Sequence, residues 1–180
     1  AGIVSVFGGT GADTFDASHA AYNTTGVYFN GGGGADDLTG GASTDTFVFA
    51  TRVNLAAAAA ITGNGGNDTI SLTTQGQAVL NADFANVTSV QALTFADGTG
   101  SSAVLAVTAN TAGIASVYGG SGNDTLTVDE TIYTAPTFHG AGGTDVLILS
   151  NSAATLVDSF FTDVLSVASF QTANGANDIT

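Results

Sequence analysis

The sequence has no cysteine, no methionine, no tryptophan and no lysine, so Arg52 is the only strongly basic side chain in 180 residues. Without cysteine, the chain can form neither disulfides nor thiolate metal sites. Without lysine, and with a net charge of −14, it lacks the phosphate contacts that nucleic-acid binding requires, and a P-loop cannot form. The longest apolar stretch, near Val53–Ile61, is mostly alanine and too short for a bilayer, so we expect no membrane span.

Glycine is abundant, and much of it falls in a recurring pattern. Three segments fit G-G-x-G-x-D-x-U-x, in which U is a large apolar residue: Gly8–Asp16, Gly31–Thr39 and Gly119–Thr127. Looser copies are Gly40–Val48, Gly63–Ser71 and Gly140–Ile148, and a truncated seventh copy is Ala173–Thr180. Six of the seven copies have an apolar residue two places after the aspartate, which is hard to produce by chance.

The residue types of the pattern favour calcium binding. Glycines can adopt positive φ and bring backbone carbonyl oxygens close to an ion without a Cβ clash. The aspartate adds a hard anionic oxygen, and calcium takes six to eight such oxygens in irregular geometry. An acidic, solvated surface is the alternative interpretation of the charge, but it does not explain the placement of the glycines.

The residues after each aspartate alternate between polar and apolar, as in Thr14-Phe15-Asp16 and Thr125-Leu126-Thr127. This period of two predicts a short strand with one side chain facing inward. Repetition of turn and strand predicts an all-β fold, a parallel β-roll or β-solenoid with calcium-binding glycine-rich turns. The side chains expected to stack in its interior are Phe15, Leu38, Phe47, Ile70, Leu126 and Leu147.

The spacing of the aspartates predicts which turns are neighbours. Asp36 and Asp45 are nine residues apart and should lie on opposite edges of one coil. Spacings of 23, 23 and 21 residues separate the pairs Asp13–Asp36, Asp45–Asp68 and Asp124–Asp145. Each of these spacings is about one coil, so the two aspartates of a pair should lie on the same edge of adjacent coils. We infer at least three calcium sites, one for each pair. Because the motif carboxylates would repel one another without cations, calcium binding should be coupled to folding.

A long internal repeat organises the chain. Gly2–Asp13 matches Gly113–Asp124 at an offset of 111 residues, and Phe84–Val90 matches Phe161–Val167 at an offset of 77. We therefore predict one continuous solenoid over residues 1–180, with repeat units of approximately 2–95 and 113–172. The chain opens within the pattern and closes within a motif, so we expect it to be a segment of a longer polypeptide.

Other elements are predicted from composition. Residues 53–61 should form one or two helical turns, and residues 104–107 and 115–117 should be strands. Residues 84–95 and 161–170 should be plain strands or irregular excursions.

The sequence has few residues of the types that catalyse reactions, and we expect no enzyme activity. His19 and His139 are the only histidines, and serine and threonine are too common for their neighbourhood to be informative. Asp37 should face solvent. We interpret the aspartates outside the motif as surface charge: Asp16, Asp83, Asp97, Asp158 and Asp163.

These motifs resemble the RTX (repeats-in-toxin) family, and the Ala/Gly/Thr-rich composition is most similar to bacterial RTX surface-layer proteins. The resemblance implies export by a type I secretion machine and folding outside the cell. It also implies the ligands: carboxylates of Asp13, Asp36, Asp45, Asp68, Asp124 and Asp145, and backbone carbonyls of Gly9, Gly11, Gly32, Gly34, Gly120, Gly122 and Gly143. The sequence departs from the family pattern at Ser43, Asn64 and Ala141, and Ser43 makes the Asp45 site the weakest.

The expected function is that of a calcium-binding structural segment of a secreted bacterial surface layer, or of another extracellular lattice or filament at the cell surface. Its partners would be copies of itself, with a cell-surface polysaccharide as a further candidate. Two alternatives remain open. One is a stalk module of an RTX adhesin, and the other is the calcium-binding C-terminal domain of a secreted hydrolase or toxin.

Overall fold

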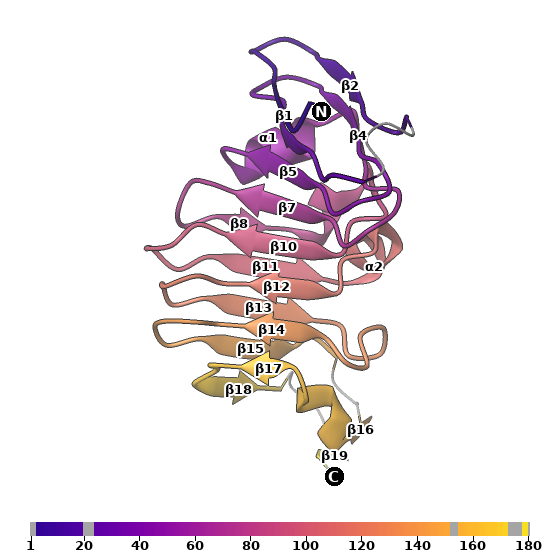
Figure 1. Cartoon of the computed structure of the whole chain (residues 1–180). Helices are drawn as coiled ribbons and strands as arrows, with labels where there is room; N and C mark the ends of the chain where they lie inside the picture. Colours follow the sequence, from indigo (N-terminus) through magenta and orange to yellow (C-terminus); the bar gives the residue numbers. More distant parts are fainter. Residues whose placement is uncertain (1–2, 20–23, 152–154, 173–177, 180) are drawn as a thin grey trace.

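The chain folds into a solenoid of stacked coils, which the computed structural model describes for residues 3–19, 24–151, 155–172 and 178–179. Figure 1 shows the strands lying one below another from the N-terminal to the C-terminal end. All strand pairs in the sheets are parallel, and residues that face each other are mostly 18 to 26 positions apart. The solenoid predicted from the glycine pattern is therefore confirmed.

One eight-stranded sheet, the long sheet, runs through both repeat units. Its order is β1-β3-β5-β7-β10-β12-β14-β17. The strands are β1 (Ser5–Phe7), β3 (Tyr28–Asn30), β5 (Thr46–Phe49), β7 (Thr69–Leu72), β10 (Ala92–Phe95), β12 (Ser116–Tyr118), β14 (Thr137–His139) and β17 (Val164–Leu165).

The opposite side of the solenoid is divided between two sheets. The N-terminal sheet has the order β2-β4-β6-β9, and the C-terminal sheet has the order β18-β15-β13-β11-β8. The former contains β2 (Thr14–Asp16), β4 (Asp37–Thr39), β6 (Ala60–Thr62) and β9 (Val87–Thr88). The latter contains β8 (Ala78–Val79), β11 (Ser102–Leu105), β13 (Thr125–Val128), β15 (Val146–Leu149) and β18 (Ser169–Gln171). A separate pair joins β16 (Thr155–Leu156) to β19 (Asp178–Ile179).

Short helices stack where the two smaller sheets meet. They are α1 (Arg52–Ala57), the 3-10 helix η2 (Asn81–Phe84) and α2 (Val107–Ala112), and a second 3-10 helix, η3 (Asp158–Phe161), lies near the C-terminal end. Contacts from one coil to the next hold them. The Asn81 side chain accepts hydrogen bonds from the N–H groups of Ala106 and Ala109 and so caps α2, whose own N-cap is an alanine.

The interior is one continuous cluster of apolar side chains from the sheets on both sides. Leu38, Phe47, Ile70, Leu126 and Leu147 are fully buried, as predicted, whereas Phe15 is only partly buried against the core. Facing strands place Phe47 opposite Ile70 and Leu126 opposite Leu147. Phe29 and Phe47 stack with ring centroids 5.1 Å apart.

Several local predictions need correction. Residues 53–61 do form a short helix, but it ends at Ala57 and strand β6 follows. Residues 104–107 were expected to be strand, yet β11 ends at Leu105 and α2 begins at Val107. The repeated segments near Phe84 and Phe161 begin as 3-10 helices before their strands. No helix among the described residues is long and apolar enough to cross a membrane.

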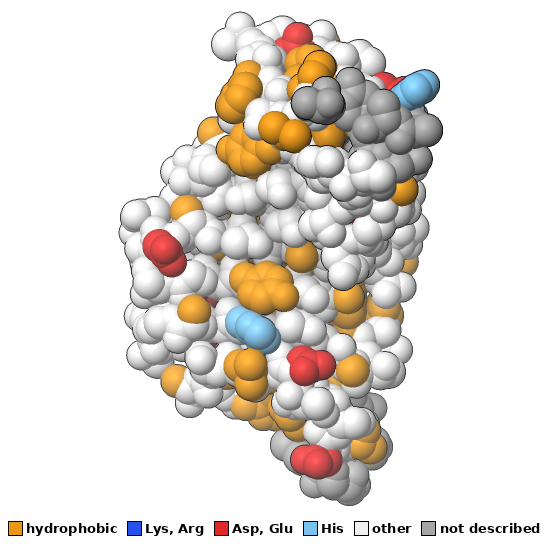
Figure 2. Space-filling view, viewed as in Figure 1, with side chains coloured by type: hydrophobic (Ala, Val, Ile, Leu, Met, Phe, Trp, Pro, Cys, Tyr) orange, Lys and Arg blue, Asp and Glu red, His pale blue; other side chains and the backbone are white. Residues whose placement is uncertain are grey.

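The surface is less acidic than the net charge suggests. Figure 2 shows isolated acidic side chains on a largely uncharged face rather than a continuous acidic patch. The reason is that five of the motif aspartates are buried in the corners of the solenoid.

Candidate calcium sites

The motif aspartates lie in three rows at the corners of the solenoid. The N-terminal row contains Asp13 and Asp36, the middle row Asp45 and Asp68, and the C-terminal row Asp124 and Asp145. In each row, the amide N–H of the first aspartate donates to Oδ1 of the second, one coil further on, over 3.0, 2.7 and 2.8 Å respectively. The structure thus brings together the three pairs that the spacing predicted.

In two of the rows, the first aspartate also accepts a hydrogen bond from a backbone N–H of the preceding coil. Val27 N–H donates to Asp45 Oδ1 over 2.7 Å, and Ser101 N–H donates to Asp124 Oδ1 over 2.6 Å. In five of the six aspartates, all but Asp13, one carboxylate oxygen therefore anchors the preceding coil. This leaves Oδ2 for other partners.

The first glycine of each motif makes room for Oδ2. A Cβ on Gly8, Gly31, Gly40, Gly63, Gly119 or Gly140 would overlap the carboxylate of the aspartate five residues later. Oδ2 accepts a hydrogen bond from within the turn at Asp13 and Asp45. At Asp68, Asp124 and Asp145, Oδ2 is buried and has no hydrogen-bond partner.

Other glycines of the motif bring carbonyl oxygens together between stacked turns. Gly32, Gly34, Gly120 and Gly143 have positive φ, whereas Gly9, Gly11 and Gly122 do not, so positive φ is not shared by all the predicted carbonyl ligands. A Cβ on Gly34 would overlap the Gly11 carbonyl oxygen, and one on Gly143 would overlap that of Gly122. These positions need glycine for close backbone approach.

Among the residues that the structure describes, the buried motif carboxylates have no cationic partner. Asp45, Asp68 and Asp145 are 0 % exposed, and Asp36 and Asp124 are 2 % exposed. Among the described residues, the one ion pair joins Arg52 to Asp83. Burial, with a smaller contribution from the neighbouring Asp45 carboxylate, raises the pKa of Asp68 to about 6. Burial and the Asp145 carboxylate also raise the pKa of Asp124. A bound cation would remove this cost.

A comparison with protein families matched residues 28–49, 60–73 and 111–130 to the RTX calcium-binding nonapeptide repeat (4 copies). The chain carries RTX calcium-binding repeats. The RTX segments contain the turns that end at Asp36, Asp45, Asp68 and Asp124. No curated protein and no solved structure matched the chain. RTX nonapeptide repeats bind Ca²⁺, and they are a structural rather than a catalytic motif.

The corners of the solenoid offer oxygen ligands that suit calcium, and many of these ligands are backbone carbonyls. Within the described part of the chain, no three His, Asp or Glu side chains gather into a metal cluster. The oxygens on offer are instead the unpartnered Oδ2 atoms and the carbonyls crowded between turns, which are the hard ligands calcium prefers. Calcium bound there would neutralise carboxylates from two coils and so hold the coils together. The assignment of individual ligands remains a prediction.

The departures from the RTX pattern are accommodated locally. The turn containing Ser43 keeps its geometry, because Asp45 is fully buried and Gly41 N–H donates to its Oδ2 over 2.7 Å. Asn64 and Ala141 replace glycine and nevertheless adopt positive φ, at 66° and 65°. The Asn64 side-chain amide donates to the Gly40 carbonyl over 2.8 Å, whereas Ala141 has no side chain that could do so.

One of the acidic residues outside the motif was misinterpreted from the sequence. Asp16, Asp97, Asp158 and Asp163 are exposed, as predicted for surface charge. Asp83 is instead buried and receives two hydrogen bonds from the Arg52 guanidinium, at 2.8 and 2.9 Å. The prediction failed because Arg52 lies 31 residues away, on a helix that becomes a neighbour only when the coils stack. Asp37 is half-buried on strand β4.

Sequence reasoning also missed two glycine-free corners. Ser89 and Ser166 adopt positive φ, at 56° and 57°, in turns that close the middle and C-terminal rows. In the first, Gln91 Oε1 accepts the Asp68 N–H over 2.7 Å, as the next aspartate of the row would. The 77-residue repeat was the available signal, since it aligns Ser89 with Ser166.

The two histidines lie outside the candidate calcium sites. His19 is exposed, and the His139 ring packs edge-on against Tyr118 with centroids 5.1 Å apart. Neither residue lies in the corner rows.

Proposed function

We propose that this RTX solenoid is a structural segment of a secreted bacterial surface layer or similar extracellular lattice, in which copies stack end to end. Calcium in the corner rows would fix each copy as a rod. The observation that carries the proposal is that a hollow lined by apolar side chains opens near each end of the described solenoid.

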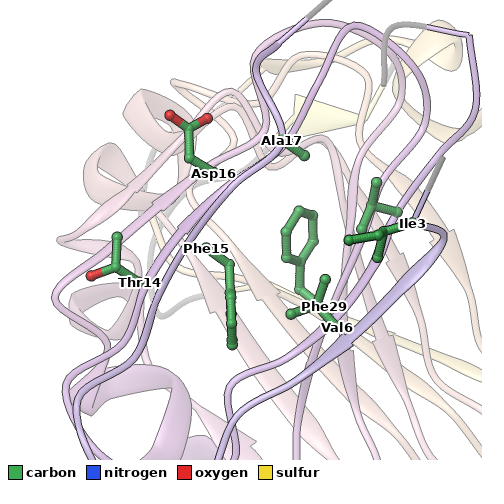
Figure 3. Close-up of a pocket in the computed structure, with 8 residues that line it drawn as sticks. Ile3, Val6, Thr14, Phe15, Asp16, Ala17 and Phe29 are labelled. Atoms are coloured by element: carbon green, nitrogen blue, oxygen red, sulfur yellow. The ribbon is translucent and has the colours of Figure 1, made fainter. Parts of the chain in front are cut away.

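At the N-terminal end, a hollow of about 270 Å³ opens between strands β1, β2 and β3. Figure 3 shows Phe15 on one side of it and Ile3, Val6 and Phe29 on the other. Nearby, the Phe7 side chain is 68 % exposed. At the C-terminal end, a hollow of about 340 Å³ is lined by apolar side chains that include Phe161 and Phe170. Exposed apolar surface next to unpaired strand edges favours association with another chain.

The internal repeat supplies a register for that association. Strand β1 corresponds to β12 at the 111-residue offset, and β18 corresponds to β10 at the 77-residue offset. Within the chain, β12 pairs with β10. Strand β1 of one copy placed on β18 of another would pair these repeat equivalents with Val6 opposite Phe170, and would join the long sheet of one copy to the C-terminal sheet of the other.

The test is a calcium titration followed by circular dichroism and light scattering, with magnesium as the control ion. We expect a calcium-specific gain of β structure and, at higher protein concentration, growth of ordered assemblies. Val6→Lys, which puts a charge into the junction, should abolish growth but keep the calcium-induced β signal. Val107→Lys is the matched control, since Val107 is 63 % exposed on α2, which Figure 1 shows midway along the solenoid.

Calcium-induced folding without assembly at any concentration would argue against the lattice and favour the adhesin stalk or the calcium domain of a secreted hydrolase. Full β structure in chelator, unchanged by calcium, would overturn the structural role of the ion as well.

A further inference from the structure

A second kind of buried carboxylate lies outside the RTX turns. Glu130 follows strand β13 at the far end of that strand from the glycine turn, and it is 7 % exposed. Its Oε1 atom is buried and has no hydrogen-bond partner. Glu130 lies outside the nine-residue motif Gly119–Thr127 and is the last residue of the segment that matches the RTX repeat.

Glu130 belongs to a small cluster of oxygen-bearing side chains. Asn151, one coil further on, donates from its backbone N–H to Glu130 Oε2 over 3.3 Å. The side-chain amide of Asn151 donates to Asp129 Oδ1 over 2.6 Å. Both carboxylates therefore converge on the same residue. The bond from Asn151 N–H holds the Glu130 carboxylate in the cluster through Oε2, and the other oxygen of that carboxylate, Oε1, has no partner.

The rest of the corner is ordered around Asp129. Its Oδ1 atom also accepts from the Thr131 backbone N–H and hydroxyl, at 3.1 and 2.6 Å. Tyr133, on the same loop, is 5 % exposed, and its hydroxyl is buried without a partner. Two independent side chains of this loop thus hold buried polar atoms that the described protein does not satisfy, although such atoms are normally paired.

An unpartnered buried oxygen costs more free energy on the charged Glu130 than on a neutral group. A buried carboxylate is stable only if it is paired, coordinated or protonated. The chain has no lysine, and its single arginine is already bound to Asp83. The two adjacent carboxylates of Asp129 and Glu130 supply hard anionic oxygens, the type calcium selects.

We propose that the corner formed by Asp129, Glu130 and Asn151 is an additional calcium site, with Glu130 as its buried anionic ligand. It would staple the coil that carries β13 to the coil that carries β15, at the end of those strands opposite the RTX turns. The two ends of the same pair of strands would then each be closed by an ion.

The first test is the number of calcium ions bound per chain, measured by equilibrium dialysis and elemental analysis at saturating calcium. Glu130→Gln keeps the shape and the hydrogen-bond acceptor but removes the charge, so it should bind one ion fewer. Asp158→Asn, which neutralises an exposed aspartate outside the motif, is the control and should bind the wild-type number. An unchanged count in Glu130→Gln would overturn the site.

Terbium luminescence gives a second readout that does not require counting. The chain has no tryptophan, so terbium in the proposed site would be sensitised mainly by Tyr133. Emission excited through tyrosine should fall in Tyr133→Phe and again in Glu130→Gln. Tyr118→Phe reports on terbium in the adjacent RTX turn at Gly119 and serves as the comparison. If only Tyr118→Phe lowers the emission, terbium occupies the RTX turns alone and the proposal fails.

Discussion

The middle and C-terminal rows consist of the same stacked turns, but they are closed by different side chains. In both closing turns, two successive backbone N–H groups donate to the carbonyl of the last aspartate, Asp68 or Asp145. Ser89 and Ser166 adopt nearly the same positive φ in these turns. Gln91 then adds a side-chain bond to the Asp68 N–H, whereas the corresponding residue, Ala168, cannot.

This difference separates two roles of the motif aspartate. One carboxylate oxygen anchors the neighbouring coil, and an uncharged amide can replace it, as Gln91 does. The other oxygen carries the charge and remains available to a cation, and no amide can replace that role. The middle row therefore ends where the anchoring role is kept and the charge is dropped, whereas the C-terminal row ends where both are lost.

Loss of both roles should give the largest effect. Asp124→Ala removes the acceptor of the buried Ser101 N–H, which costs about 1–3 kcal/mol. It also removes an ion site worth about 1.4–2.7 kcal/mol at 10 mM calcium, for affinities of about 10⁻⁴–10⁻³ M. We expect a combined loss of about 3–5 kcal/mol in the free energy of unfolding, measured by urea denaturation in calcium.

The exposed control should behave differently. Asp97→Ala should change the free energy of unfolding by no more than about 0.5 kcal/mol. Asp13→Ala, at a half-buried carboxylate, should lie between Asp124→Ala and Asp97→Ala. Equal losses for all three variants would contradict the assignment of the rows.

Loss of the anchoring role alone should cost less and should not depend on calcium. Gln91→Ala leaves the Asp68 N–H without its acceptor, and we expect a loss of about 1–3 kcal/mol both in calcium and in chelator. Ala168→Gln offers the missing acceptor to the C-terminal row and should stabilise by about 0.5–1.5 kcal/mol. A Gln91→Ala effect seen only in calcium would mean that Gln91 serves the ion and not the coil.

The pH dependence of the free energy of unfolding should distinguish the charged role of the aspartate from its anchoring role. Because burial raises the pKa of Asp68 to about 6, the native state in chelator binds this proton more tightly than the unfolded chain does. That contribution is complete below about pH 4, the ordinary carboxyl range, and is lost as the pH rises through 6. In calcium, the stability gained from the ion should instead appear as the pH rises through 6, because the ion requires the carboxylate.

Melting temperatures measured from pH 4 to pH 8, with and without calcium, test this contrast. Asp68→Asn should flatten both curves, since it keeps an acceptor for Asp45 N–H but cannot titrate. Parallel curves in calcium and chelator would show that the ion does not bind at this carboxylate.

The sequence predicted the repeating parts of the molecule well because each repeat carries its own chemistry. The glycine-aspartate turns, the inward residues such as Phe47 and Ile70, and the pairing of aspartates follow from local pattern and spacing. The errors concern contacts between coils. Nothing local in residues 107–112 predicts a helix, because its cap is Asn81 from the preceding coil, and Asp83 looks like surface charge until Arg52 is placed beside it.

The smallest expected effect concerns backbone conformation alone. Ala141 occupies a motif glycine position at φ 65°, a conformation that costs an L-residue about 1–2 kcal/mol. Ala141→Gly should therefore raise the free energy of unfolding by about 1 kcal/mol, equally in calcium and in chelator, because the carboxylates are untouched. Ala42→Gly is the matched control: Ala42 is an exposed turn residue without positive φ, so the added flexibility should destabilise by about 0.5–1 kcal/mol. Opposite signs for two identical substitutions would show that backbone conformation, and not the loss of a methyl group, determines the outcome. The same sign for both would mean that the turn at Gly140 is not held in the left-handed conformation in solution.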